Sequence, residues 1–264
     1  MKMLNGGELA GFMKEAQATR VRSLVGRGIT PKLVIIRDSD NPVIVKYVNL
    51  KQQYGEDIGV MVEDWCGKNV AELIERANAD TTVHGLIVQL PIATDNLDEL
   101  LPRIAPAKDV DGLNPDGEVF ESATATAINY LLAGYNVELT GKRIALVGHG
   151  RLVGAPLERM WRSSGLDVTV FNSKSDLTEL ANYNVVVSAT GVPHLIKSSM
   201  IMGGAIVVDA GTASEGGVLV GDLDDEVRER TDLTALTPKI GGVGPLTVTA
   251  LFEHVLIAAE NAAS

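Results

Sequence analysis

Short apolar segments alternate with amphipathic ones along most of the chain. In the N-terminal half this periodicity predicts strands at residues 32–36, 60–62 and 84–90 and helices at about 42–57 and 69–79. The first helix has Asp40 or Asn41 as its cap and Pro42 in its first turn, and Gly59 follows its end. Strands that are apolar throughout and separated by helices indicate a mostly parallel sheet covered on both faces.

The alternation resumes after a loop rich in Asp, Gly and Pro. The second half has strand patterns at 143–147, 167–171, 185–189 and 205–209, and helical patterns at about 126–133, 154–164 and 245–262. We therefore expect an α/β protein of two lobes with a cleft between them. The first lobe takes residues 1–127, and the C-terminal helix at 244–264 packs back onto it. The second lobe, residues 128–243, is a Rossmann-type parallel sheet.

The composition is that of an ordinary globular protein with an acidic balance. Of the 264 residues, 45% are hydrophobic and 22% charged, and the formal net charge of −11 repels phosphate backbones, so nucleic acid is not expected as a partner. No run of about 18 apolar residues and no signal peptide is indicated, which predicts a cytoplasmic protein without a membrane partner. Cys66, the only cysteine, excludes an intrachain disulfide, and together with four scattered histidines it predicts no metal site.

A glycine-rich turn follows the strand at 143–147 and opens a helix. Its candidate contacts to a dinucleotide are Gly148, His149, Gly150, Arg151, Val153 and Gly154. Glycine permits a tight turn and the close approach of a pyrophosphate, and the first turn of the helix offers free N–H groups and the positive end of the helix dipole. The alternative is a turn that binds nothing, but the strand before it and the helix after it favour a nucleotide.

The tip of the next strand bears on the choice of nucleotide. NAD-selective sites usually place Asp or Glu there, whereas this chain has Asn172 followed by Ser173 and Lys174. Because a hydroxyl and a cation suit a 2′-phosphate, we predict NADP, with NAD as the alternative, and expect Arg151 or His149 to assist Ser173 and Lys174. The alternative for this tip is a solvated turn with an ordinary lysine.

Small residues follow two later strands of the second lobe. Thr190 and Gly191 come after the strand at 185–189, and Gly211 comes after the strand at 205–209. Open α/β sheets bind ligands at the carboxyl ends of their strands, so we expect these residues to leave room for a nicotinamide ribose. Plain turns are the alternative.

Polar residues suited to acid–base chemistry lie in the first lobe. Tyr47 and Lys51 are four apart on a predicted helix and therefore share one face. Gln89 stands at the carboxyl end of a strand, where an amide is an unusual choice for packing, and Asp109 and Asp111 lie in a loop. Taken singly, each has a plain structural explanation, such as a lysine that covers a tyrosine ring or the turn chemistry of Asp and Gly.

Five segments taken together resemble one enzyme family. They are Tyr47-x-x-x-Lys51, Gly85-Leu86-Ile87-Val88-Gln89-Leu90-Pro91, Lys108-Asp109-Val110-Asp111-Gly112, Val153-Gly154-Ala155-Pro156, and Thr237-Pro238 followed by Gly241-Gly242-Val243-Gly244-Pro245-Leu246-Thr247. Their order and approximate spacing resemble the bifunctional methylenetetrahydrofolate dehydrogenase/cyclohydrolase family over nearly the whole chain.

The resemblance implies oxidation of 5,10-methylenetetrahydrofolate with NADP, then hydrolysis of the 5,10-methenyl cation to 10-formyltetrahydrofolate. It implies that Lys51 handles protons and polarises the folate and that Gln89 orients Lys51. It also implies that Tyr47 stacks near the pterin, whose N–H groups donate to Asp111. A lysine in a partly desolvated site has a lowered pKa, and an amide orients it without adding a charge.

The resemblance further implies a larger substrate site and an assembly. Leu90, Pro91, Gly241, Gly242 and Pro245 are its remaining substrate-binding candidates, with the loop at 241–245 closing on folate and cofactor. A cytoplasmic homodimer is implied as well.

The chain departs from the family pattern at four places. Ile44 stands where serine is frequent, Ser122-Ala123-Thr124-Ala125 replace Pro-Cys-Thr-Pro, His149 replaces an arginine, and Lys239-Ile240 replace Val-Pro. The alternatives are a family member with one of the two activities, an amino-acid or shikimate dehydrogenase-like oxidoreductase, and a non-catalytic nucleotide-binding sensor. A shikimate dehydrogenase-like protein would not require Gln89 beside Lys51.

Overall fold

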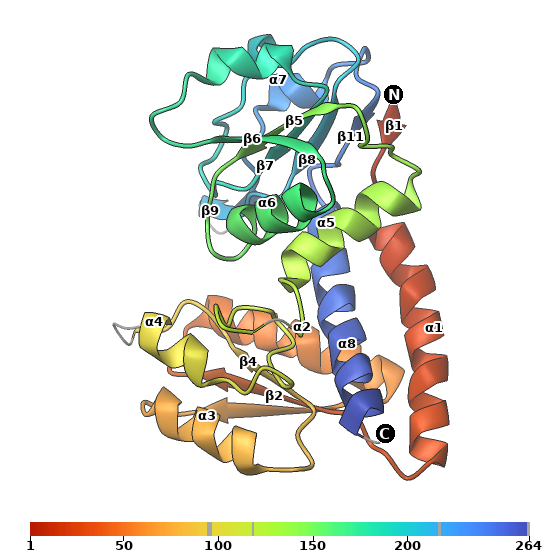
Figure 1. Ribbon diagram of the computed structural model, residues 1–264, viewed down its shortest axis with the longest axis vertical. Helices are drawn as coiled ribbons and strands as arrows, with labels where there is room; N and C mark the ends of the chain where they lie inside the picture. Colours follow the sequence, from red (N-terminus) through yellow and green to blue (C-terminus); the bar gives the residue numbers. More distant parts are fainter. Residues whose placement is uncertain (94–96, 118, 216–217, 263–264) are drawn as a thin grey trace. The chain divides into compact units, whose positions relative to one another are not determined.

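The computed structural model describes residues 1–93, 97–117, 119–215 and 218–262 (Figure 1). The chain divides into two compact units, each built around a parallel sheet. The three-stranded unit comprises Gly11–Ala123 and the chain from Val248 onward, and the six-stranded unit comprises Met1–Ala10 and Thr124–Thr247. The predicted α/β class with parallel sheets is confirmed.

The predicted helices and strands follow one another in the expected order, with the unpredicted helix α1 of 21 residues and several short elements added. Up to residue 103 they are β1 (Lys2–Met3), α1 (Gly6–Gly26), β2 (Lys32–Arg37), α2 (Pro42–Ile58), β3 (Met61–Cys66), α3 (Val70–Ala79), β4 (Gly85–Val88), α4 (Leu97–Leu100) and the 3₁₀ turn η1 (Leu101–Arg103). After it come α5 (Ala123–Gly134), β5 (Arg143–Val147), α6 (Gly154–Ser163), β6 (Asp167–Phe171), η2 (Leu177–Asn182), β7 (Val185–Ser188), η3 (Ser198–Met200), β8 (Ile206–Asp209), β9 (Ala213–Glu215), β10 (Val218–Val220), α7 (Asp225–Arg228), β11 (Ala235–Leu236) and α8 (Val243–Ala262).

The three-stranded sheet has the order β3-β2-β4, and both pairs of strands are parallel. Successive side chains of β2 point to opposite faces. Val34 and Ile36 pack with Ile74 of α3 in one buried cluster, on the side of the sheet that α3 covers in Figure 1. Helix α2 comes close to β3 because Gly55 has no side chain: a Cβ there would lie 2.4 Å from Cγ2 of Val62.

Helix α2 has the ends that its sequence specifies. The side chain of Asn41 accepts a hydrogen bond from the Val43 amide at 2.9 Å, and Pro42 occupies the first turn, so Asn41 rather than Asp40 is the cap. Gly59 ends the helix with φ of 88°, a left-handed conformation that favours glycine. These two ends fix which residues of α2 face the sheet.

Helix α8 contributes core and polar contacts to the three-stranded unit. The ring of Phe252 stacks on Tyr54 of α2 at 4.8 Å, and Glu253 forms an ion pair with Arg20 of α1. By length and mean hydropathy α8 meets the criteria for a membrane-spanning helix, but 61% of its most apolar stretch is buried inside the protein. Burial against α1 and α2 accounts for its apolar character.

The six-stranded sheet is parallel throughout and has the order β1-β11-β8-β7-β5-β6. From β5 the chain moves outward to β6 and then returns to the other side of β5 with β7. The strand order therefore reverses between β5 and β7, which is where open α/β sheets bind their ligands.

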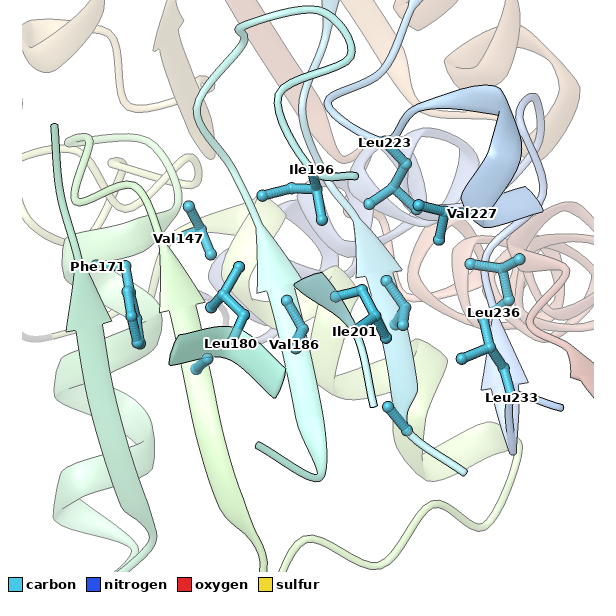
Figure 2. Close-up of a cluster of buried hydrophobic side chains, with 13 residues drawn as sticks. Val147, Phe171, Leu180, Val186, Ile196, Ile201, Leu223, Val227, Leu233 and Leu236 are labelled. Atoms are coloured by element: carbon cyan, nitrogen blue, oxygen red, sulfur yellow. The ribbon is translucent and has the colours of Figure 1, made fainter. Parts of the chain in front are cut away.

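One face of this sheet is covered by the segments that connect its strands. Figure 2 shows Val147, Val186 and Leu236 of the strands directed toward Leu180 of η2 and Val227 of α7. Because these strands lie in the middle of a parallel sheet, residues of both faces are buried, as the continuous apolar sequences predict.

The N-terminal residues differ from the expected division into lobes. The expected first lobe begins at residue 1, whereas Lys2 and Met3 pair with Ala235 and Leu236 at the edge of the six-stranded sheet. A strand of two residues has no readable periodicity, so its partner could not be predicted. Helix α1 was not predicted either, and the strand expected at 60–62 extends to Cys66.

Candidate active site

A lysine and a glutamine are joined at the carboxyl edge of the three-stranded sheet. Lys51 lies on α2 one turn after Tyr47, and its Nζ donates to Oε1 of Gln89 at 2.7 Å. Gln89 directly follows β4, and its backbone amide donates to Ile36 of the neighbouring strand β2 at 2.8 Å. The parallel pairing of β2 with β4 therefore places the glutamine beside the helix that follows β2.

The amide of Gln89 has one orientation in this arrangement. Its Nε2 donates to the carbonyl of Leu90 at 3.0 Å, which leaves Oε1 to accept from Lys51. The peptide bond between Leu90 and Pro91 is cis; Leu90 is half-buried and Pro91 is exposed. Gln89 is thus held at both ends of its side-chain amide.

Asp111 shares the electrostatic environment of Lys51. Burial lowers the pKa of the Lys51 amine, and the Asp111 carboxylate partly opposes this. Burial also raises the pKa of Asp111 to about 6, with Lys51 opposing the rise and Asp109 adding to it. An amine with a lowered pKa beside a carboxyl group with a raised pKa brings the proton affinities of the two groups closer together, which is typical of an acid–base site.

The predicted substrate residues divide between the two units. Tyr47, Lys51, Gln89, Leu90, Pro91 and Asp111 belong to the three-stranded unit, and Gly241, Gly242 and Pro245 belong to the six-stranded unit. In the six-stranded unit, the carbonyl of Gly241 accepts from the amide of Gly7 at 3.1 Å. A Cβ on Gly6 would lie 1.8 Å from the carbonyl oxygen of Gly242, so the start of α1 holds this loop through close backbone contact.

The turn after β5 has the close backbone approaches that its glycines suggest. Gly148 has φ of 95°, and a Cβ there would lie 2.7 Å from the carbonyl oxygen of Ala189 at the end of β7. A Cβ on Gly154 would lie 2.2 Å from the carbonyl oxygen of Gly148, whereas one on Gly150 would meet nothing within 4 Å. Two glycines therefore shape the turn, and the third leaves an open surface over it.

Helix α6 begins in this turn without a side-chain cap. Its N-cap residue, Val153, offers no side-chain acceptor, but fewer amides are free than the sequence suggested. The amide of Ala155 donates to the carbonyl of Gly150 at 3.1 Å and Pro156 has no N–H, so among the described contacts only the amide of Gly154 stays open in the first turn. An uncapped helix start behind an open glycine turn, at the point where the strand order reverses, fits the pyrophosphate of a dinucleotide. We regard Gly148, Gly150 and Gly154 as the residues that would hold it.

The tip of β6 lies beside this turn. The amide of Gly148 donates to the carbonyl of Phe171 at 2.8 Å, and Asn172 Oδ1 accepts from the amide of Lys174 at 2.9 Å. Ser173 and Lys174 are both exposed. Their hydroxyl and ammonium groups are accessible to an anion at the tip.

His149 has an anionic partner that the sequence did not suggest. Its Nε2 lies 2.6 Å from Oε2 of Glu158 on α6, and the other oxygen of Glu158 accepts from Nε of Arg162 at 2.7 Å. Arg151 is exposed. The carboxylate of Glu158 therefore introduces a negative charge close to the predicted phosphate site, on the first turns of the helix.

Behind the predicted nicotinamide residues lies a buried carboxylate that sequence reasoning missed. Asp222 is 0% exposed and accepts from Ser188 Oγ at 2.6 Å and from the amide of Thr190 at 2.7 Å. A Cβ on Gly211 would lie 1.9 Å from Asp222 Oδ1. Asp222 thus fixes the backbone of Thr190 and requires glycine at 211, and Gly191 follows with φ of 67°.

A second buried carboxylate supports the same edge. Asp209 Oδ1 accepts from the amides of Gly211 and Asp222, both at 3.1 Å, and Oδ2 accepts from the amide of Leu223 and from Arg228. Asp209 ends β8, so the sequence offered one signal, a polar residue at a strand end. Gly211 is two residues away, whereas Asp222, Leu223 and Arg228 lie 13 to 19 residues further along the chain and carried no signal of the contact.

Comparisons with known proteins agree with this geometry. The chain matches the catalytic domain of tetrahydrofolate dehydrogenase/cyclohydrolase over residues 4–111 and the NAD(P)-binding domain of the same enzyme over residues 122–263. The bifunctional protein FolD of Lactobacillus helveticus (strain DPC 4571) is 37% identical over 275 residues, which cover 97% of this chain and 96% of that protein.

Solved structures give the same result. FolD methylenetetrahydrofolate dehydrogenase/cyclohydrolase from Campylobacter jejuni is 32% identical, with a TM-score of 0.94 over 99% of each chain. The Trypanosoma brucei dehydrogenase–cyclohydrolase (FolD), complexed with NADP cofactor and inhibitor, is 28% identical, with a TM-score of 0.91 over 99% of this chain and 98% of that chain. The chain therefore belongs to the tetrahydrofolate dehydrogenase/cyclohydrolase family.

Proposed function

We propose that this protein oxidises 5,10-methylenetetrahydrofolate to the 5,10-methenyl cation with NADP and hydrolyses that cation to 10-formyltetrahydrofolate. The observation that carries this proposal is the hydrogen bond from Lys51 to Gln89, next to a carboxylate with a raised pKa. The family membership supports the same pair of reactions. No feature of the site favours a shikimate dehydrogenase-like reaction or a binding function without catalysis.

Lys51 serves both steps as the group that holds or moves a proton. In hydrolysis, water adds to the methenyl carbon and loses one proton. The bond from this carbon to one ring nitrogen then breaks, that nitrogen gains a proton, and the remaining hydroxyl proton leaves to solvent as the formyl carbonyl forms. A buried amine with a lowered pKa is neutral more often than an ordinary lysine, so it can accept the first proton and return it to that nitrogen. Gln89 fixes the direction of the amine without adding a charge that would raise its pKa again.

Asp111 is the residue that we assign to the pterin. Its carboxylate receives no hydrogen bond from the described residues, so it is free to accept from the amino and ring N–H groups of a substrate. Tyr47 offers its ring one turn before Lys51 on α2. Leu90, Pro91, Gly241, Gly242 and Pro245 remain candidates for the rest of the substrate surface.

The cofactor that we assign is NADP, which takes up the hydride when it is bound. The uncapped start of α6 and the glycines of the preceding turn receive its pyrophosphate. We assign Ser173 and Lys174 to the 2′-phosphate, because the serine hydroxyl can donate to it and the lysine ammonium attracts it. Asp222 holds the amide of Thr190 in place at the nicotinamide end.

We further propose that the enzyme is a cytoplasmic homodimer without a membrane or nucleic-acid partner. The net charge of −11 supports the exclusion of nucleic acid. Light scattering of the purified protein across a dilution series measures the assembly directly, and a mass of one chain at all concentrations contradicts the dimer.

One assay tests the proposed reactions. Purified protein is mixed with 5,10-methylenetetrahydrofolate and either NADP or NAD, and the absorbance of the methenyl product is followed as it forms and decays. We expect formation with NADP at a higher kcat/KM than with NAD, and faster decay than in buffer. Binding of NADP without any methenyl formation contradicts the proposal and favours a nucleotide-binding sensor.

A further inference from the structure

The loop that carries Asp111, residues 108–112, is held by backbone contacts on both sides. The amide of Leu86 in β4 donates to the carbonyl of Lys108 at 2.7 Å, and the amide of Ala123 donates to the carbonyl of Asp111 at 3.2 Å. Gly112 has φ of 65°, and a Cβ there would lie 2.4 Å from the carbonyl carbon of Glu121. The loop therefore has little freedom at either end.

A histidine of α8 holds the middle of this loop. His254 is 6% exposed, and its Nδ1 lies 2.8 Å from the carbonyl oxygen of Val110, the residue before Asp111. The imidazole also stacks on Phe120, with ring centroids 5.0 Å apart and an interplanar angle of 29°. No step of the proposed reactions uses this histidine.

The hydrogen bond determines the tautomer of His254. A carbonyl oxygen only accepts, so Nδ1 must carry the proton. Burial lowers the pKa of the imidazole, and this outweighs the opposing effects of the Val110 carbonyl and of the carboxylates Glu253 and Glu121. His254 is therefore neutral at physiological pH, and Nε2 carries no proton.

A neutral donor suits this position better than a charged one. A cation beside Val110 would stabilise the ionised form of Asp111 and draw its pKa down, as Lys51 does from the other direction. A residue without a donor would leave the buried carbonyl of Val110 unpaired, which favours a rearrangement of the loop. The imidazole satisfies the carbonyl without adding a charge.

We propose that His254 is a positioning residue for Asp111: by its hydrogen bond to the carbonyl of Val110 it holds the Asp111 carboxylate in the orientation that binds the folate substrate. This inference rests on the proposed function, since it concerns the binding of the same substrate. It adds a residue from the far C-terminal helix to the substrate site, although that residue does not touch the substrate.

Two substitutions separate the contribution of the hydrogen bond to Val110 from that of the ring stacked on Phe120. His254→Asn keeps a donor near the position of Nδ1 and loses the stacked ring, and His254→Phe keeps the ring on Phe120 and loses the donor. Leu256→Ala is the matched control, because Leu256 is also buried in α8 but points to a different side of the helix. It weakens the packing of α8 without touching the hydrogen bond to Val110.

We expect His254→Phe to raise KM for 5,10-methylenetetrahydrofolate by about tenfold, the effect of one lost buried hydrogen bond. Its dissociation constant for NADP stays unchanged, and the acid limb of kcat/KM moves to lower pH because the loosened loop admits water to Asp111. In His254→Asn, KM stays within about threefold of the wild-type value, and the acid limb of kcat/KM stays at the wild-type pH. A merely structural role predicts instead that the change in KM follows the loss of melting temperature in all three variants, His254→Phe, His254→Asn and Leu256→Ala.

A titration that needs no turnover completes the test. The carboxyl carbon of Asp111, assigned with Asp111→Asn, is followed by NMR in the wild type and in both His254 variants. A lower Asp111 pKa in His254→Phe but not in His254→Asn supports the proposal; equal pKa values in all three proteins overturn it. If the wild type produces no methenyl compound while the titration differs as expected, the proposed function fails and the positioning of Asp111 by His254 stands.

Discussion

Asp111 and Asp209 are both largely buried aspartates beside a parallel sheet, and their surroundings differ in one respect. Asp209 receives three backbone amides and the guanidinium of Arg228. Asp111 receives no hydrogen bond from the described residues, and only the charge of Lys51 favours its ionised form. Burial is common to both, but the protein supplies hydrogen-bond donors to Asp209 and, among the described residues, none to Asp111.

The difference separates a structural carboxylate from a chemical one. A carboxylate whose acceptors are all filled by the protein has none to offer a ligand and holds the backbone in place. A carboxylate left without donors raises the free energy of the folded protein until a ligand supplies them. Asp209 therefore supports the edge on which the cofactor is expected to bind, and Asp111 has acceptors left for the folate that we assign to it.

The largest effect that we expect concerns Lys51. Lys51→Met removes the amine that moves the proton and keeps a chain of similar length, so the rate of methenyl hydrolysis falls by about 10³- to 10⁴-fold. The affinity for NADP stays unchanged, measured by titration calorimetry. Lys46→Met, an exposed lysine on the same helix, is the control and should retain full activity. Hydrolysis at the wild-type rate in Lys51→Met contradicts the role of this residue.

Arg228→Met tests Asp209, the carboxylate that the protein itself supplies with hydrogen-bond donors. It removes the cation from Asp209 and leaves the carboxylate buried with amides only, which lowers the free energy of unfolding by about 3–4 kcal/mol. Denaturant unfolding of the whole chain measures this change, and the six-stranded unit should report it first.

The matched control for that variant is Lys239→Met, which removes a cation whose ion pair with Asp225 is exposed on both sides. Because exposed ion pairs contribute about 0–1 kcal/mol, we expect a much smaller loss. Equal losses in the two variants would remove the distinction between the Asp209 cluster and an ordinary surface pair.

Asp111→Asn tests the carboxylate that receives no hydrogen bond from the described residues, and here we expect a loss of substrate binding rather than of stability. We expect KM for the folate substrate to rise by about 30-fold, since a charged acceptor of two N–H groups is lost. In the wild type KM should rise as the pH falls below about 6, where Asp111 takes up a proton, and in the variant this acid dependence disappears.

The same substitution should stabilise the protein at neutral pH. The folded pKa of Asp111, about 6, lies above its ordinary value of 3.8, so wild-type stability is highest in acid and falls as the pH rises through about 6. Asn avoids this loss, and we expect a gain of about 1 kcal/mol at pH 7.5 after allowance for solvent screening. A loss of stability in Asp111→Asn would mean that the carboxylate has a structural partner like that of Asp209.

The smallest effect concerns the cofactor. Glu158→Gln removes a negative charge beside His149 and should shift the ratio of kcat/KM for NADP over NAD upward by about threefold, because one repulsion of the 2′-phosphate is lost. Glu229→Gln, an exposed carboxylate in the same unit, is the control. An unchanged ratio would show that His149 and Glu158 lie outside the reach of the phosphate.

Apart from helix α1, the sequence predicts the main strands and helices because their patterns and ends are encoded locally. The ends of α2 follow from Asn41, Pro42 and Gly59, and the position of Gln89 beside α2 follows from parallel strands and the length of the helix between them. The hydrogen bond between Lys51 and Gln89 was expected from the family resemblance and not from the amphipathic pattern. The roles of these residues remain predictions.

The polar contacts between distant segments could not be predicted in the same way. Asp209 and Asp222 lie in a strand end and a loop whose turn-like sequences give no sign that the two meet. His254 stands in an apolar helix, and its partner Val110 is 144 residues away. Such contacts depend on how the sheets and helices pack, and a single sequence carries no local signal of them.

Each compact unit combines two separated stretches of the sequence, and this has a consequence for synthesis. The edge of the six-stranded sheet needs Lys2 and Met3 beside Ala235 and Leu236, and the three-stranded unit needs the second part of α8. Neither unit is complete until nearly the whole chain has left the ribosome, so the nascent protein exposes apolar surface for most of its translation. Truncation before α8 therefore yields a target for chaperones and proteases rather than a smaller working domain.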